Sequence, residues 1–367
     1  MNPLRVIISG GGTGGHIFPA IAIADALKEK YNKIEILFVG ALGRMEMEKV
    51  PAAGYKIVGL DIRGFQRRLT LSHFVTLFKA ILSLRKAKQI IKEFNPDVVV
   101  GVGGYASGPV LRKAAAFGIP TLIQEQNSYP GITNRILARR VNKICVAYER
   151  MEKYFPKDKI RITGNPVRQD VANLEGKKQI ALEFFGLDAN KKTVLVIGGS
   201  LGARTINESI LKSLEELVAN NIKLVWQTGQ AFYKKAQQAV KNLEGKIKVV
   251  DFITKMDYSY AVADVVVSRA GAISISELCL VKKPSILIPS PNVAEDHQTK
   301  NAMMLVNHTA AILIKDAEAK EKLCTTLLDL MKDESKRNKL GNNIAQLGIK
   351  NSADLIAEEI FSLVKKK

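Results

Sequence analysis

The chain alternates short apolar runs with longer amphipathic segments almost throughout its length. Short apolar runs rich in Val and Ile are typical of parallel strands that are buried on both faces. In the first half, these runs occupy residues 4–9, 34–40, 55–60, 97–102, 120–124 and 142–147. The first intervening segment predicts a helix, because one helical face carries Ala20, Ile21, Ala24, Leu27 and Tyr31.

The same pattern begins again after a polar, lysine-bearing stretch at residues 165–179. The second set of predicted strands occupies residues 193–198, 222–227, 247–252, 264–269, 284–289 and 310–314. A chain of 367 residues also exceeds the ~250–300 residues that one core usually serves. The sequence therefore predicts an α/β protein of two doubly wound, Rossmann-like domains that face a cleft, residues 1–165 and 166–349. A final helix, about 350–367, can pack back on the first domain.

Glycine-rich turns follow four of the predicted strands. They occur in "VIISGGGTGGH", "VVVGVGGYASG", "VLVIGGSLGAR" and "VVVSRAGAISISE", each of which consists of a strand, a turn and a helix start. Glycine at the carboxyl end of a parallel strand lets backbone N–H groups approach an anionic ligand. We expect these turns to line the ligand site.

The first glycine turn also fits a dinucleotide-binding fingerprint, through Gly10, Gly12 and Gly15. That fingerprint requires an acidic residue at the end of the second strand, but this strand runs into "ALGR". Because Arg44 could accept a 2′-phosphate, an NADP-binding oxidoreductase remains an alternative. A Walker A loop is excluded, since no Gly-Lys-Ser/Thr follows the glycines.

Composition and charge narrow the classes of partner that the chain is expected to bind. Hydrophobic residues make up 47% and charged residues 25%, as in a globular protein, and the net charge is +20. Such an excess favours nucleic acid, an anionic membrane surface or phosphorylated substrates. Aromatic residues make up only 6% and form no stripe with basic ones, which argues against nucleic-acid binding.

Three cysteines, Cys145, Cys279 and Cys324, lie far apart without metal-ligand spacing, so we expect reduced thiols. No apolar run approaches the ~20 residues of a membrane-spanning helix, which predicts a cytoplasmic or peripheral protein. Residues 67–88 predict a basic amphipathic helix suited to an anionic bilayer, or one that packs on the sheet. Its apolar face is Leu71, Phe74, Val75, Phe78, Ile81 and Leu82, and its cations are Arg67, Arg68, Lys79, Arg85, Lys86 and Lys88.

A specific set of motifs runs in order along residues 4–350: "GGTGGHIFPAIAIADAL", "GVGGYASGP", "EQNSYPGITNR", "GNPVR", "GGSLGAR" and "SRAGAISISEL". With these motifs, the chain resembles the MurG family of bacterial peptidoglycan N-acetylglucosaminyltransferases. The resemblance implies a GT-B fold and inverting transfer of N-acetylglucosamine from its UDP derivative to lipid I, which forms lipid II. It implies no cofactor, a peripheral position at the cytoplasmic face of the inner membrane, and cell-wall synthesis proteins as partners. A UDP-sugar transferase with another acceptor remains an alternative.

Three positions depart from common family members. Leu201 stands where Gln is common, Gln124 replaces a frequent His, and His297 precedes Gln298 where some members have two glutamines. We expect these departures to change side-chain contacts and not the reaction.

The leaving UDP needs positive charge or dipoles around its diphosphate. No Asp-x-Asp occurs for a metal, so we expect Arg168 and the turn with Ser200 to stabilise the diphosphate. Arg168 could instead form an interdomain ion pair. The resemblance assigns Glu277 to the ribose hydroxyls and the Ile253 backbone to uracil, although Glu277 could also cap its helix.

Amide side chains suit neutral sugar hydroxyls, because they both donate and accept hydrogen bonds. Asn127 and Gln298 are therefore expected at the sugar, and Tyr105 and Asn134 at the acceptor. Tyr105 and Asn134 could equally be ordinary loop polarity.

A base must take the proton of the acceptor hydroxyl as the new bond forms. His16 suits this role, since histidine titrates near ~6.5 and His16 directly follows the first glycine turn. Thr13, Gly14 and Gly15 would let both substrates crowd against it. His16 could instead donate a hydrogen bond or cap its helix, and Glu125 is a competing base.

Overall fold

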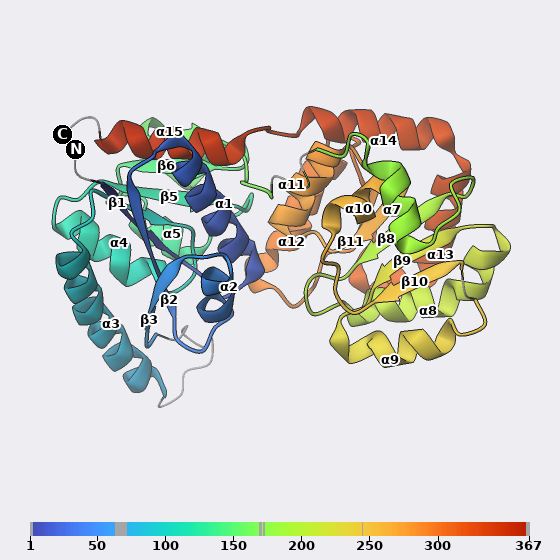
Figure 1. Cartoon of the computed structure of the whole chain (residues 1–367), viewed down its shortest axis with the longest axis horizontal. Helices are drawn as coiled ribbons and strands as arrows, with labels where there is room; N and C mark the ends of the chain where they lie inside the picture. The colour runs from blue at the N-terminus through green and yellow to red at the C-terminus, as the bar shows by residue number, and fades with distance from the viewer. Residues whose placement is uncertain (1–2, 63–71, 169–170, 172, 244, 365–367) are drawn as a thin grey trace. The chain divides into compact units, whose positions relative to one another are not determined.

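The computed structural model describes residues 3–62, 72–168, 171, 173–243 and 245–364, and the chain forms two compact units (Figure 1). The first unit comprises residues 1–167 and 351–367, and the second comprises residues 168–350. The division between the two units falls between residues 167 and 168.

The first unit contains a fully parallel seven-stranded sheet in the order β3-β2-β1-β4-β5-β6-β7. Val6 in its middle strand pairs with Ile36 on one side and Val98 on the other. The strands are β1 (Leu4–Ser9), β2 (Ile34–Ala41), β3 (Lys56–Leu60), β4 (Val98–Gly101), β5 (Thr121–Glu125), β6 (Lys143–Val146) and β7 (Ile160–Ile162). The sequence did not predict β7, because three half-exposed or exposed residues at a sheet edge leave no apolar run.

Helices cover both faces of this sheet because successive strand residues point to opposite faces. Val6 and Ile8 pack in a core with α1 and α15, whereas Ile7 packs in a second core with α3, α4 and α5. The helices are α1 (Gly14–Lys30), α2 (Glu46–Ala52), α3 (Ser72–Phe94), α4 (Ser107–Ala116), α5 (Ile132–Leu137) and α15 (Ser352–Val364), with short 3₁₀ turns at η1 (Met151–Lys153) and η2 (Lys157–Lys159).

The last helix, α15, packs on α1 of the first unit (Figure 1). Tyr31 and Phe361 stack with ring centroids 4.4 Å apart, and Lys30 pairs with Glu358 at 2.7 Å. The chain thus returns to its first unit after completing the second.

Helix α3 contains most of the predicted membrane segment. Leu71, Arg67 and Arg68 lie outside the described residues, as do the side chains of Phe74, Val75, Phe78, Lys79 and Ile81. In the described part, Ser83, Ala87, Ile90 and Ile91 are buried, whereas Leu82, Arg85, Lys86 and Lys88 are exposed. One face of α3 therefore packs on the sheet and the other presents cations and a leucine to the outside.

The second unit contains a parallel six-stranded sheet in the order β10-β9-β8-β11-β12-β13. Its strands are β8 (Thr193–Ile197), β9 (Lys223–Gln227), β10 (Ile247–Val250), β11 (Val265–Ser268), β12 (Ser285–Leu287) and β13 (Ile312–Leu313). Its helices are α7 (Lys177–Phe185), α8 (Arg204–Ala219), α9 (Gln230–Ala239), α10 (Met256–Val262), α11 (Ala272–Val281), α12 (His297–Val306), α13 (Ala319–Lys332) and α14 (Glu334–Gln346), with 3₁₀ turns η3 (Ala294–Asp296) and η4 (Asp316–Glu318). Both units thus have the strand order of doubly wound Rossmann folds, as predicted.

Candidate functional site

The strand order reverses once in each sheet, between β1 and β4 in the first unit and between β8 and β11 in the second. Open α/β sheets bind their ligands at this switch point, outside the carboxyl ends of the strands. The four glycine-rich turns follow these four strands. Each unit therefore presents a pair of glycine turns where a ligand is expected.

In the first unit, the two glycine turns press against each other. A Cβ atom on Gly104 would lie 2.4 Å from the carbonyl oxygen of Gly11, and one on Gly10 would lie 2.3 Å from Val102. A Cβ on Gly103 would lie 2.9 Å from the His16 ring. The large number of glycines thus has a structural reason: two turns and an imidazole share space that leaves no room for side chains.

A buried carboxylate that sequence reasoning missed holds the first glycine turn. Glu46, at the start of α2, is 1% exposed. Its Oε2 accepts from the backbone N–H of Gly12 at 2.8 Å and its Oε1 accepts from Ala41 at 3.0 Å. Gly11 must lack a side chain because its Cβ would lie 2.2 Å from this carboxylate. Arg44, the residue considered for a 2′-phosphate, is exposed. The nearby acidic residue Glu46 was the feature of the sequence that could have indicated a carboxylate at this turn.

His16 lies near the start of α1 with its ring fixed by local hydrogen bonds. Its Nδ1 is 3.1 Å from the carbonyl oxygen of Gly11 and 3.3 Å from Thr13 Oγ1. Because a carbonyl can only accept, the neutral ring carries its proton on Nδ1. The lone pair then lies on Nε2. This Nδ1-protonated tautomer is the one in which Nε2 can act as a general base.

Glu125 and Asn134 are buried and hydrogen-bonded to each other in the structure. Asn134 is 2% exposed, and its Nδ2 donates to Glu125 Oε2 at 2.9 Å. Glu125 is equally buried and also accepts from Asn127 N at 3.0 Å, Asn127 Nδ2 at 3.2 Å and Gly131 N at 3.1 Å. Burial raises the pKa of Glu125, while these hydrogen bonds oppose the shift. With both oxygens engaged by Asn127, Gly131 and Asn134, Glu125 organises the loop that these residues form, and its part as a competing base stays a prediction.

A buried amide network, also missed from sequence, joins this loop to its neighbours. Gln124 Nε2 donates to Asn165 Oδ1 at 2.9 Å, and Asn165 Nδ2 donates to the carbonyl of Gln126 at 3.0 Å. Gln126 in turn donates to the carbonyl of Val102 at 2.8 Å, at the end of β4. The departure at Gln124 therefore concerns internal positioning, since its side chain is fully buried. Tyr105 follows the β4 turn and is half exposed, so a ligand can reach it.

In the second unit, the turn after β8 is exposed at its tip. Ser200 is exposed, and Leu201, which departs from the family pattern, is 83% exposed. A Cβ on Gly202 would lie 1.9 Å from the carbonyl oxygen of Thr228, so this turn packs directly on the one after β9. Such a turn at a helix start offers backbone N–H groups to an anion.

Glu277 lies in α11 and is 8% exposed. Its Oε2 accepts from the hydroxyl of Tyr260 at 2.9 Å. Burial raises the pKa of Tyr260 well above its ordinary value, the Glu277 charge raises it further, and the Arg168 charge opposes this. The structure therefore brings Arg168, Tyr260 and Glu277 into one electrostatic group. Tyr260 was not identified from the sequence because its apolar neighbours resemble an ordinary helix core.

The two remaining predicted residues of the second unit differ in exposure. Ile253, which follows β10, is 6% exposed and belongs to the core, so only its backbone is suited to ligand contact. Gln298, near the start of α12, is half-buried and accepts from Ser290 N through its Oε1 at 2.8 Å. Its carbonyl is thus held by the loop, and its amide N–H groups are the part that suits a sugar hydroxyl.

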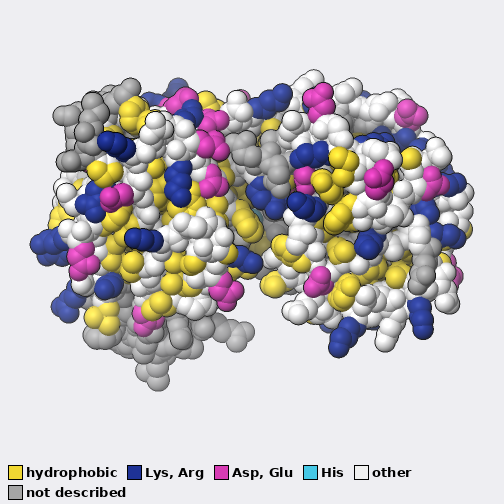
Figure 2. Space-filling view, in the orientation of Figure 1, with side chains coloured by type: hydrophobic (Ala, Val, Ile, Leu, Met, Phe, Trp, Pro, Cys, Tyr) yellow, Lys and Arg dark blue, Asp and Glu magenta, His cyan; other side chains and the backbone are white. Residues whose placement is uncertain are grey.

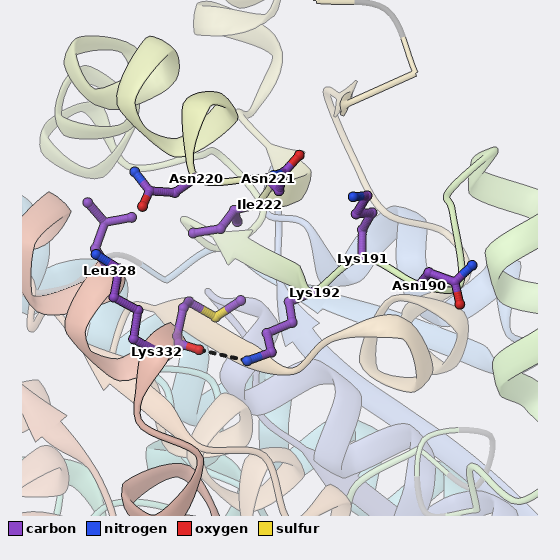
Figure 3. Close-up of a pocket in the computed structure, with 9 residues that line it drawn as sticks. Asn190, Lys191, Lys192, Asn220, Asn221, Ile222, Leu328 and Lys332 are labelled. Atoms are coloured by element: carbon purple, nitrogen blue, oxygen red, sulfur yellow. Dashed lines mark hydrogen bonds between the residues drawn. The ribbon is translucent and has the colours of Figure 1, made fainter.

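A pocket of about 290 Å³ in the second unit lies at the amino ends of the strands, away from the glycine turns at their carboxyl ends (Figure 3). Its residues precede β8 and β9 or end α13, and Lys192 donates to the carbonyl of Met331 at 3.0 Å. Cations are favoured at carboxyl-terminal helix ends. Lys192 therefore satisfies the end of α13, and we place no UDP-sugar in this pocket.

The described residues offer neither a metal site nor a membrane-spanning helix. No three His, Cys, Asp or Glu side chains in this part of the chain are grouped as a metal site requires. None of its helices combines the length and apolar character needed to cross a bilayer. On the face drawn in Figure 2, Lys and Arg side chains are spread among acidic and apolar ones and do not form a single stripe.

Family models match both halves of the chain. The N-terminal domain of glycosyltransferase family 28 matches residues 6–146, and the C-terminal domain of the same family matches residues 193–359. The second match extends into α15, which packs in the first unit.

Full-length relatives and a solved structure agree with these matches. The UDP-N-acetylglucosamine–N-acetylmuramyl-(pentapeptide) pyrophosphoryl-undecaprenol N-acetylglucosamine transferase of Parabacteroides distasonis is 56% identical over 368 residues, 100% of both chains. The enzyme of the same name from Flavobacterium psychrophilum is 51% identical over 369 residues, also 100% of both chains. The crystal structure of Acinetobacter baumannii MurG superposes with a TM-score of 0.79 at 26% identity, covering 98% of this chain and 100% of that one. The chain therefore belongs to glycosyltransferase family 28 and, within it, to the family of these N-acetylglucosamine transferases.

Proposed function

We propose that the chain transfers N-acetylglucosamine from UDP-N-acetylglucosamine to lipid I, the undecaprenyl-diphosphate-linked N-acetylmuramoyl-pentapeptide, and so forms lipid II for peptidoglycan. The observation that carries this proposal is the 56% identity over the whole length of an enzyme named for this reaction. The glycine turns at the switch point of the second unit support it, because a UDP-sugar needs an anion-binding strand end.

In the proposed step, a sugar hydroxyl of the acceptor attacks the anomeric carbon of N-acetylglucosamine from the side opposite the UDP oxygen. The new C–O bond forms as the bond to UDP breaks, which inverts the configuration. Nε2 of His16 takes the hydroxyl proton, and UDP leaves with the bonding electrons. The Nδ1–H···O hydrogen bond to Gly11 supports this role, because it leaves the Nε2 lone pair as the acceptor.

The leaving UDP is assigned to the second unit. Arg168 and the backbone N–H groups around Ser200 would stabilise the charge that develops on the diphosphate. Glu277, oriented by Tyr260, would accept hydrogen bonds from the ribose hydroxyls, and the Ile253 backbone would contact uracil. Gln298 would bind the transferred sugar through its amide.

Thr13, Gly14, Gly15 and Asn127 of the first unit are assigned to the UDP-N-acetylglucosamine donor, and Tyr105 is assigned to the acceptor. We propose that the chain works as a peripheral protein at the cytoplasmic face of the inner membrane, alongside other cell-wall synthesis proteins. The exposed cations and Leu82 on α3 support contact with an anionic bilayer. Membership of a glycosyltransferase family gives no support to the alternative of an NADP-binding oxidoreductase.

A transfer assay tests the proposal. The purified chain is incubated with UDP-N-acetylglucosamine and lipid I, and both UDP release and the mass of the lipid product are followed. We expect equal amounts of UDP and lipid II, with no UDP release above background when the acceptor is omitted. Failure to modify lipid I, together with transfer to another acceptor, would instead favour a different UDP-sugar transferase.

A further inference from the structure

An open groove of about 560 Å³ runs between α5 and the turn at residues 151–156 of the first unit. We call it the α5 groove. Its walls combine aliphatic, aromatic and basic side chains, chiefly Ile132, Arg135, Ile136, Arg139, Lys153 and Tyr154. None of these residues has a place in the chemical step described above.

The apolar part of the α5 groove is exposed to an unusual degree. Ile132 and Ile136 are 61% and 70% exposed. Because they are four residues apart in a helix, they lie on the same face. Adjacent large aliphatic side chains left in water mark a surface that a ligand or partner covers.

The basic part of the α5 groove is braced by aromatic rings. The Arg135 guanidinium lies 5.9 Å from the Tyr129 ring centroid, and the Tyr129 ring meets the Tyr154 ring edge-on at 5.3 Å. Lys153 Nζ lies 5.0 Å from the Tyr154 ring centroid. With Arg139, the groove has three cations against one acid, Glu152. This composition suits a ligand that joins an aliphatic chain to a phosphate or diphosphate.

The α5 groove adjoins the loop that carries Asn127. That loop ends at Gly131, one residue before α5 begins. The Glu125 carboxylate ties the two together, since it accepts from Gly131 N at 3.1 Å and from Asn134 Nδ2, inside α5, at 2.9 Å. A ligand whose sugar lies at the loop can therefore extend its lipid directly into the groove.

From this arrangement we propose that the α5 groove binds the lipid-proximal part of the acceptor: its diphosphate at Arg139 and Lys153, and the first isoprenoid units at Ile132 and Ile136. This inference rests on the proposed function. It makes the groove a determinant of acceptor chain length, separate from the residues that act on the sugar.

The test compares two synthetic acceptors with the same sugar, peptide and diphosphate, one with a long polyprenyl chain and one with a short alkyl chain. Kinetics are measured in detergent, without vesicles. For the Ile132→Ser/Ile136→Ser double variant, we expect the KM for the long-chain acceptor to rise about tenfold or more while the KM for the short-chain one stays constant. For Arg139→Ser, the KM should rise for both acceptors, because both carry the diphosphate. The KM for UDP-N-acetylglucosamine should not change in either variant.

Matched controls are Ile180→Ser and Lys322→Ser, whose side chains are exposed in the second unit. They should leave both acceptor KM values unchanged. A double isoleucine variant that is folded by circular dichroism and keeps the wild-type chain-length preference would overturn the proposal. Loss of vesicle binding with unchanged kinetics in detergent would also overturn the proposal, because it would show that the groove contacts the bilayer and not the acceptor. If the wild-type chain modifies neither acceptor, the proposed function itself fails, whereas a failed groove leaves wild-type transfer intact.

Discussion

The hydroxyl of Tyr260 donates to Oε2 of Glu277 at 2.9 Å, and both side chains are buried in the second unit. This hydrogen bond has one direction only, because burial raises the pKa of Tyr260 well above its ordinary value and the phenol stays protonated. Tyr260 thus holds one carboxylate oxygen and fixes the orientation of the other.

Glu277→Ala should raise the KM for UDP-N-acetylglucosamine more than tenfold, since an acceptor for the ribose hydroxyls is worth ~1–3 kcal/mol. Tyr260→Phe should raise the same KM by a smaller factor, because the carboxylate remains but is less well oriented. Initial rates over a range of UDP-sugar concentrations measure both effects. Since Tyr260 stays protonated, its removal should not alter the alkaline side of the pH profile. A folded Glu277→Ala chain with the wild-type KM would withdraw the assignment.

His16→Ala should lower kcat by ~10²–10⁴-fold if the imidazole acts as the base. The affinity for UDP, measured by isothermal titration, should stay nearly constant because UDP is assigned to the second unit. The base must be deprotonated to act, so wild-type activity should fall as the pH falls, and this acidic limb should be absent from the variant. His308→Ala, an exposed histidine in the second unit, is the control. A His16→Ala chain that keeps most of its kcat and its acidic limb would exclude the base role.

Glu46→Ala should destabilise the first unit and reduce transfer, because the N–H groups of Gly12 and Ala41 lose their acceptor. The unsatisfied donor on the buried Ala41 typically costs ~1–3 kcal/mol, whereas water can reach the N–H of the exposed Gly12. Denaturant unfolding and kcat measure the two effects, while UDP binding should persist. Glu48→Ala, an exposed residue of the same helix, provides the comparison. Equal stability of the two variants would show that the carboxylate does not hold the glycine turn.

Gly104→Ala should abolish most activity, whereas Gly118→Ala should not. Both glycines have left-handed backbones, with φ of +84° and +70°. Only Gly104 faces a neighbour, since its Cβ would lie 2.4 Å from the Gly11 carbonyl oxygen, while a Cβ on Gly118 meets nothing within 4 Å. Backbone strain alone costs roughly 1–2 kcal/mol, so Gly118→Ala isolates that term. Similar losses of kcat and melting temperature in both variants would argue against the turn-to-turn contact.

The chain should float with vesicles that contain anionic lipid and not with neutral ones, and salt should weaken binding because exposed cations mediate it. Replacing Arg85, Lys86 and Lys88 together with Ser should reduce flotation without altering kinetics on a detergent-solubilised acceptor. Wild-type binding to neither kind of vesicle would defeat the proposed membrane contact.

The sequence by itself determined the fold class, most strands and the positions of the glycine turns. These follow from local information, since Val- and Ile-rich runs such as residues 97–102 bury on both faces and glycines permit tight turns at their ends. The family, too, was evident from the motifs, because they contain the residues nearest the expected ligand.

Only the tertiary structure decided which polar side chains stay accessible. Glu46 contacts Gly12 across 34 residues and Gln124 contacts Asn165 across 41, and no local pattern specifies such pairs. Asn134 and Glu125 have the chemistry of substrate-binding groups, yet they bury against each other because the loop's own N–H groups need acceptors. Likewise, α15 is amphipathic in sequence, but its place on α1 depends on a stacking partner, Tyr31, more than 300 residues earlier. Residue type sets what a side chain can bind, and long-range packing sets whether a substrate can reach it.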